Sequence, residues 1–155
     1  MSENPHDLTP EQEARFAEIK RQRTLDSPYY QLLGMELVEL EPGACRFRLA
    51  ADSKLHNLGG VVHGGALASV ADAAMGVSLA TLTDPHTERP ITVELKINFM
   101  AAVVEGELEA RGRIIQRGRT VAVGEAEVTD AEGRLVAKAM GTFVIRGRDP
   151  EERIR

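Results

Sequence analysis

Tryptophan is absent from this chain of 155 residues, and aromatic residues make up only 4% of it. Proteins that bind single-stranded nucleic acid stack the bases on aromatic side chains and follow the phosphates with basic ones. The net charge of −5 argues against such a basic surface. We therefore expect no nucleic acid among the partners of this protein.

Cysteine is also scarce. Cys45 is the single cysteine of the sequence, so no disulfide can form within the chain. No apolar run approaches the length that crosses a bilayer, and the polar, acidic first residues do not resemble a signal peptide. We therefore expect a cytoplasmic protein without a membrane partner, and Cys45 is expected in the core rather than as a nucleophile.

What is present is the composition of an ordinary globular domain, with 43% hydrophobic and 28% charged residues. The length fits one domain, which we place at residues 29–146. Residues 1–28 are expected to be a helical extension, disordered up to residue 8, with a helix that begins after Thr9 and ends near Arg23. A second short helix is expected at residues 28–33. Residues 147–155 are expected to be a charged, mobile tail.

The pattern of the central domain predicts an α+β fold. Residues 64–81 are apolar, rich in alanine and free of proline, and they predict one buried helix. Alternating apolar and polar residues predict strands around it. Because short turns join these strands, we expect a long antiparallel sheet of five or six strands wrapped around the helix, with edges that dimerisation can cover. The strands are expected at residues 35–40, 44–50, 91–100, 106–116, 120–129 and 134–146.

One segment combines polar and glycine residues in a way that suits chemistry. His56, Asn57 and His63 lie in a loop that leads directly into the predicted helix, and Gly64-Gly65 stand where that helix begins. The free N–H groups of a helix N-terminus can hold a negative oxygen. Farther along the helix, Asp72 places a carboxylate among apolar residues, which requires a partner or a function.

Each of these residues also has a plain structural interpretation, which stays open from the sequence alone. The glycines suit a tight turn, and Asn57 suits the loop before it. His63 can be a structural histidine, and Asp72 can face solvent. A metal site made of His56, His63 and Asp72 is disfavoured because the spacing fits no common zinc motif.

In combination, these residues resemble a known family. The run His56-Asn-x-x-Gly-x-x-His-Gly-Gly, with Asp72 nine residues after His63, is similar to the signature of PaaI-type (phenylacetyl-CoA thioesterase-like) hotdog-fold thioesterases. The stretch that begins Thr92-Val-Glu-Leu-Lys and the stretch Arg117-Gly-Arg-Thr are also similar to that branch. The resemblance covers roughly residues 29–146 and implies a hotdog thioesterase domain there.

The resemblance also implies a reaction, the hydrolysis of an aryl- or fatty-acyl-coenzyme A to the free acid and CoA. Asp72 matches the general base or nucleophile, and Asn57 and Gly64 match the groups that polarise the thioester carbonyl. His63 matches the supporting histidine, and Thr92 is the nearest match to a hydroxyl that positions the water. No metal or cofactor is implied. Substrate-binding roles are expected for four further residues: His56, Gly65, Arg117 and Arg119.

The spacing of Gly64 and Asp72 bears on assembly. Eight residues of α-helix separate their backbones by about 12 Å along the axis, which is too far for both to act on one carbonyl. Two antiparallel helices would bring Asp72 of one chain near Gly64 of another, so we expect a homodimer with shared sites. The resemblance adds a dimer of dimers.

Two other functions remain open at this stage. One is a non-catalytic acyl-CoA-binding protein on the same fold. The other is a hotdog dehydratase that acts on hydroxyacyl thioesters, which the His63-Gly64-Gly65 run disfavours. Ser69 lacks the glycine-flanked turn of a serine hydrolase nucleophile, so serine hydrolysis is disfavoured as well.

Overall fold

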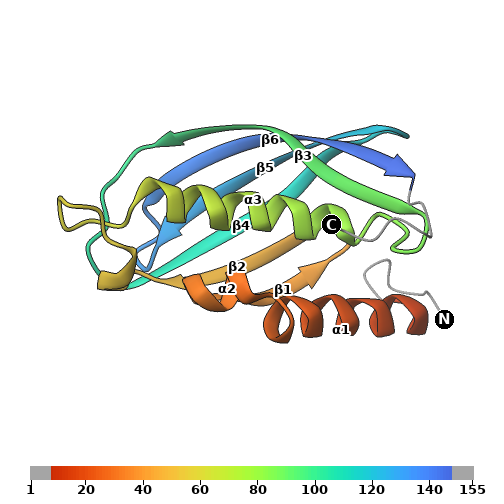
Figure 1. The fold of residues 1–155 in the computed structure, drawn as a ribbon, viewed down its shortest axis with the longest axis horizontal. Helices are drawn as coiled ribbons and strands as arrows, with labels where there is room; N and C mark the ends of the chain where they lie inside the picture. Colours follow the sequence, from red (N-terminus) through yellow and green to blue (C-terminus); the bar gives the residue numbers. More distant parts are fainter. Residues whose placement is uncertain (1–7, 148–155) are drawn as a thin grey trace.

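The helix α3 (Gly64–Ala80) is the element around which the chain is arranged, in a computed structural model that describes residues 8–147. It runs along one face of a six-stranded sheet, which curves around it (Figure 1). Most of its side chains are buried, which confirms the helix predicted from the apolar run. No helix in residues 8–147 is long and apolar enough to cross a membrane.

The sheet is antiparallel throughout, with the strand order β1-β2-β4-β5-β6-β3. This arrangement confirms the predicted α+β class and the upper strand count. Along the chain, α3 lies between β2 and β3. In the sheet, however, β3 does not pair with β2: it lies at the far edge, where it pairs with β6. The strands are β1 (Met35–Glu41), β2 (Ala44–Ala50), β3 (Glu88–Phe99), β4 (Glu107–Arg117), β5 (Val121–Asp130) and β6 (Leu135–Gly147).

The core lies between α3 and the inner face of the sheet. Phe47, Leu108 and Phe143 are almost completely buried there, as the alternation along their strands requires. Gly112 of β4 permits the closest approach, because a Cβ atom at that position would lie 2.4 Å from the carbonyl carbon of Ala74 in α3. Cys45 is buried in the same core, as expected, and its thiol donates to the Ala74 carbonyl at 3.1 Å.

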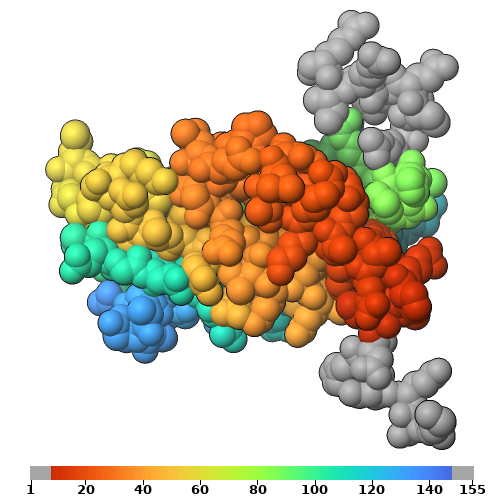
Figure 2. All heavy atoms as spheres, turned by 90° about the horizontal axis from the view of Figure 1, so that it is seen from below, coloured from red at the N-terminus to blue at the C-terminus, as the bar shows by residue number. Residues whose placement is uncertain are grey.

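Two helices precede the sheet and cover its other edge. The helix α1 (Pro10–Leu25) begins with the expected Thr9 cap, and α2 (Pro28–Leu33) ends at Gly34. Their red and orange atoms form much of the middle and right of the face seen in Figure 2, and both helices contact β1. Lys20 donates to the Val38 carbonyl on the edge strand at 3.2 Å, and Arg15 donates to the Ala80 carbonyl at the end of α3 at 2.6 Å. The extension is therefore attached to the sheet and to α3.

Two of the expected segments concern the chain ends and the start of β3. The disordered start expected at residues 1–8 and the charged tail expected at residues 147–155 lie outside the described residues, except for Leu8 and for Gly147, which belongs to β6. The strand predicted from residue 91 begins at Glu88 instead. Pro90 lacks an N–H group, but β3 is an edge strand, where proline is tolerated.

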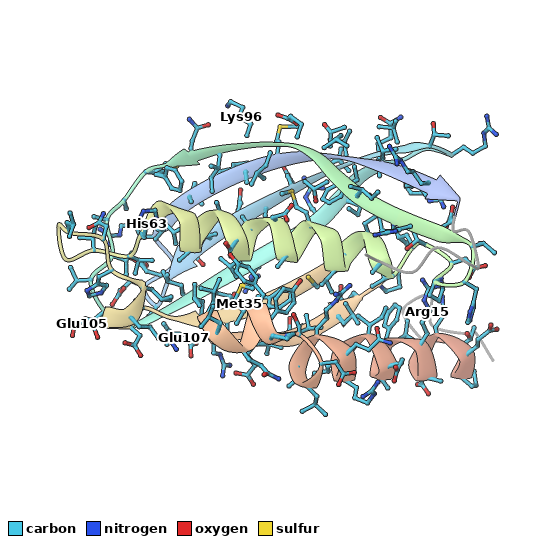
Figure 3. All side chains as sticks on the ribbon, viewed as in Figure 1. Arg15, Met35, His63, Lys96, Glu105 and Glu107 are labelled. Atoms are coloured by element: carbon cyan, nitrogen blue, oxygen red, sulfur yellow. The ribbon has the colours of Figure 1, made fainter. Side chains whose placement is uncertain are left out.

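The burial expected along β3 is also partly wrong. Val93 and Phe99, two of the apolar residues that alternate with polar ones along β3, are 57% and 53% exposed in the single chain. The register shifts between Thr92 and Glu94, and among residues 8–147 β3 has a paired strand on one side only. Lys96 and Asn98 are exposed and hydrogen-bonded to each other, and Figure 3 shows Lys96 pointing away from the sheet.

Candidate active site

The loop before α3 is a tight, hydrogen-bonded structure. Leu55 is buried beneath it, and His56 and Val62 form an isolated antiparallel bridge. The Asn57 Oδ1 accepts the Gly59 N–H at 2.8 Å, so this side chain shapes the turn as its structural interpretation expected. The amide oxygen only accepts, so Nδ2 is the part of Asn57 that can donate to a ligand.

His56 is half-buried and held by a second loop. Its Nε2 lies 2.7 Å from the Val104 carbonyl, and the carbonyl can only accept, so Nε2 carries the proton. This bond ties the loop before α3 to the segment that follows β3. The contact gives His56 a structural task, which leaves Nδ1 as the ring atom that can meet a substrate.

His63 caps the N-terminus of α3. Its Nδ1 accepts the Gly65 N–H at 2.8 Å, and the backbone of His63 is extended, as in an N-cap residue. The proton of the neutral ring must then lie on Nε2. Since the Gly65 N–H is used in this cap, Gly65 has no N–H to offer to a substrate.

Gly64 differs from Gly65 in this respect. Among residues 8–147 no acceptor is paired with its N–H, which is one of the free donors at the start of α3. The ring of Phe99 lies against Gly64, and a Cβ atom there would meet the Phe99 Cζ at 3.0 Å. Gly64 thus has a structural reason to be glycine, and it also offers the N–H that the oxyanion prediction needs.

Asp72 lies on the side of α3 that the sheet does not cover. Its side chain is half-buried in the single chain, between the buried and the solvent-facing positions that the sequence left open: the neighbouring Ala71 and Ala73 face the core, and Asp72 does not. Its Oδ1 accepts the hydroxyl of Thr92 on β3 at 3.0 Å. This bond orients one carboxylate oxygen and leaves the other for a water molecule or a substrate.

Asp72 and Thr92, predicted to act together, are therefore in contact, whereas the predicted carbonyl-binding groups are not next to them. Asn57, His63 and Gly64 lie at the N-terminal end of α3, where Figure 3 marks His63. Asp72 lies eight residues after Gly64 on the same helix, which separates their backbones by about 12 Å along the helix axis.

Arg117 and Arg119 lie at the opposite end of the sheet from His63, where β4 turns into β5. Arg117 forms an ion pair with Glu88 at the start of β3. The Asp84 N–H and then the Arg117 guanidinium hold the pKa of Glu88 below its ordinary value. Arg119 is exposed, and within the described residues it has no ion-pair partner.

A hollow of about 520 Å³ lies on the outer face of the sheet, the side away from α3. Charged side chains that line it pair with one another, as in the ion pairs of Arg46 with Glu39 and of Arg113 with Glu125. Such mutually satisfied surface pairs are typical of a solvated sheet face. This hollow is not the candidate active site, because neither Asp72 nor Gly64 lines it.

Comparison with known proteins identifies the family. The profile of the thioesterase superfamily matches residues 59–137, which include the helix α3 and the residues of the candidate site from Gly64 to Arg119. SSO2140 of Saccharolobus solfataricus, provisionally named an esterase, is 34% identical over 116 residues, which are 75% of this chain and 81% of that protein. The chain belongs to the thioesterase superfamily.

Solved structures agree with this assignment. The conserved protein PA5202 of Pseudomonas aeruginosa is 37% identical and superposes with a TM-score of 0.73, over 81% of this chain and 98% of that one. A variant of the phenylacetic acid degradation protein PaaI of Thermus thermophilus is 26% identical, with a TM-score of 0.70 over 76% and 98% of the two chains. These likenesses confirm the hotdog fold and the resemblance to PaaI, and the protein is an enzyme of the thioester hydrolase class.

Proposed function

We propose that this enzyme hydrolyses the thioester of an acyl-coenzyme A, with Asp72 as the general base or nucleophile. The observation that carries the proposal is the Thr92–Asp72 hydrogen bond, which orients a carboxylate on the uncovered side of α3. A relative in Listeria monocytogenes, 26% identical over 75% of this chain and 94% of its own, is named 1,4-dihydroxy-2-naphthoyl-CoA hydrolase. That name supports CoA as the thiol.

The roles follow from the chemistry of each group. As a base, the carboxylate of Asp72 takes a proton from water, whose oxygen bonds to the thioester carbon. As a nucleophile, it attacks that carbon itself and water releases the acid afterwards. In both cases the carbonyl oxygen gains negative charge, the C–S bond breaks, and the thiolate of CoA leaves and is protonated. The Gly64 N–H, helped by the Asn57 Nδ2 group, stabilises the charged oxygen.

A two-fold dimer reconciles these roles with the distances. Asp72 and Gly64 of one chain are about 12 Å apart along α3. An antiparallel pair of α3 helices would place Asp72 of one protomer near Gly64 of the partner subunit, which gives two equivalent sites. The long outer edge of β3, which has no partner strand in residues 8–147, supports pairing with a second copy.

The two arginines suit the CoA phosphates unequally. Arg117 already neutralises Glu88, so moving it to a phosphate would leave that carboxylate without its partner. Arg119 is exposed and has no such commitment among the described residues. We therefore assign phosphate contact to Arg119 ahead of Arg117.

The test is an assay of thiol release from acyl-CoAs with the wild type, Asp72→Asn and Asp72→Ala. Loss of a general base lowers kcat by about 10²–10⁴-fold. Glu94→Gln is a matched control, because Glu94 is an exposed carboxylate on β3 that accepts from Thr142 rather than from the site. The proposal fails if the wild type releases no thiol from any acyl-CoA, or if Asp72→Asn is as active as the wild type.

A further inference from the structure

The helix α2 reaches the uncovered side of α3 one turn before Asp72. The Tyr29 hydroxyl of α2 lies 2.6 Å from the Oγ of Ser69. Ser69 precedes Asp72 by three residues on α3, so the two side chains lie on the same side of the helix, about 5–6 Å apart at their Cβ atoms. A residue of the N-terminal extension therefore lies close to the candidate base.

The direction of this hydrogen bond follows from the contacts of Ser69. Its hydroxyl has one proton, which it donates to the Gly65 carbonyl at 2.8 Å. The Ser69 Oγ can then only accept from Tyr29, so the Tyr29 O–H is the donor. Both hydroxyls are satisfied, and Tyr29 presents its apolar ring, rather than its polar end, to whatever lies beside it.

The position of α2 is fixed on its other side. The ring of Tyr30 packs edge-on against Phe47 of the core, with the centroids 5.5 Å apart and the planes at 88°. Burial raises the pKa of the Tyr30 hydroxyl, and the nearby charge of Asp72 adds to this rise. With Tyr30 anchored in the core and Tyr29 bonded to α3, α2 forms a fixed bridge to α3 beside Asp72.

Asp72 therefore has β3 on one side, through Thr92, and the Tyr29 bridge on the other. A thioester carries two substituents, the acyl group and the long CoA thiol, and the CoA nucleotide needs an open path. It cannot pass a ring bonded to α3 within one helical turn, about 5.4 Å, of the base. The substituent that faces Tyr29 must then be the acyl group.

We propose that Tyr29 is a specificity-determining residue that closes the acyl end of the site and restricts the enzyme to short or compact acyl groups. This inference rests on the proposed function and deepens it. An acyl group that extends toward α2 meets the 52%-exposed ring after only a few carbon atoms. Long fatty-acyl chains are excluded by this barrier rather than by weaker chemistry at Asp72.

The experiment measures kcat/KM for butanoyl-CoA and dodecanoyl-CoA in the wild type, Tyr29→Ala, Tyr29→Phe and Ser69→Ala. The wild type should prefer butanoyl-CoA. Tyr29→Ala should raise the ratio of dodecanoyl to butanoyl activity about tenfold or more, as expected for opening an apolar pocket. Tyr29→Phe and Ser69→Ala loosen the ring without removing it, so a rise of a few-fold is expected.

Leu25→Ala is the control, an exposed apolar residue at the end of α1 that should leave the ratio unchanged. A merely structural role of Tyr29 would lower both activities equally and keep the ratio fixed, which would overturn the inference. A wild type that prefers dodecanoyl-CoA would overturn it too. If Tyr29→Ala does not fold, the activity ratio of Ser69→Ala tests the inference, because this variant removes the α3 hydroxyl that accepts from Tyr29.

Two outcomes separate the role of Tyr29 from the thioesterase activity itself. A fixed ratio together with an inactive Asp72→Asn variant removes the role of Tyr29 and leaves the thioesterase intact. A wild type that hydrolyses neither substrate nor any other acyl-CoA removes both.

Discussion

The hydrogen bond from Thr92 to Asp72 yields a prediction whose size follows from the structure. Thr92→Val has nearly the same shape and removes only the hydroxyl that donates to Oδ1 at 3.0 Å. Hydrogen bonds to charged groups contribute about 1.5–3 kcal/mol. Because Thr92 is exposed and water can replace its hydroxyl, the lower end applies. A loss of about 1.5 kcal/mol from the transition state lowers kcat about tenfold.

The assay follows thiol release at saturating acyl-CoA, so that kcat is measured apart from KM. Thr92→Ser keeps the hydroxyl and should retain most of the activity, which separates the hydrogen bond from the shape of the residue. Thermal unfolding of both variants should match the wild type, because the bond lies outside the core. Full activity in Thr92→Val would refute the role of Thr92 in orienting the carboxylate.

Three other predictions concern stability and reactivity. Gly112→Ala should destabilise the fold by about 3 kcal/mol or more, because its Cβ would overlap the backbone of α3. Gly147→Ala, where no atom of residues 8–147 lies within 4 Å of the added Cβ, should change the free energy of unfolding by less than about 0.5 kcal/mol. Chemical denaturation measures both, and equal stability would contradict the packing. Burial raises the pKa of the Cys45 thiol to about 11, so a thiol reagent at pH 8 should modify the unfolded protein and spare the native one, and rapid native labelling would refute its burial. The Asp84 N–H and the Arg117 guanidinium lower the pKa of Glu88 in the folded protein below its ordinary value of 4.5. These two contacts therefore stabilise the fold fully above pH 4.5, and their contribution is lost as the pH falls through the pKa of Glu88 in the folded state. Arg117→Ala should therefore cost about 0.5–1 kcal/mol at pH 7 and progressively less below pH 4.5, and a pH-independent difference in unfolding free energy would exclude the ion pair as the cause.

Local patterns predicted most of the fold. The helix α3 and the strand β2 lie where alanine-rich and alternating sequences placed them, since each pattern admits one way to bury its apolar residues. The order of the strands could not be read in this way. The position of β3 at the edge depends on the path taken after α3, and that position explains both Pro90 in the strand and the exposed Val93.

The candidate site was predictable where its residues are close in sequence. Asp72 and Gly64 share a helix, so their separation could be estimated from the helical rise. The contact between Thr92 and Asp72 depends on the register of a strand reached through a loop, which local sequence patterns do not determine. Tyr29 gave no signal, because its place beside Ser69 arises from the packing of the extension on the domain.

The shared site is the central claim, and subunit complementation tests it most directly. Gly64→Pro removes the proposed oxyanion donor at the first position of α3, where proline is tolerated, and the extended backbone of His63 suits a following proline. Gly64→Ala is its control, because it adds the same contact with Phe99 and keeps the N–H. Loss of such a donor costs about 10²–10³-fold in kcat, so Gly64→Pro and Asp72→Asn should each be nearly inactive.

The decisive measurement is the activity of a heterodimer of these two variants, purified with two different tags. If the two residues act across a two-fold interface, one of its two sites contains both intact, and the heterodimer should have about half of the wild-type activity. If Asp72 and Gly64 of the same chain formed the site, both sites would be broken. A heterodimer as inactive as its parents would therefore contradict the account.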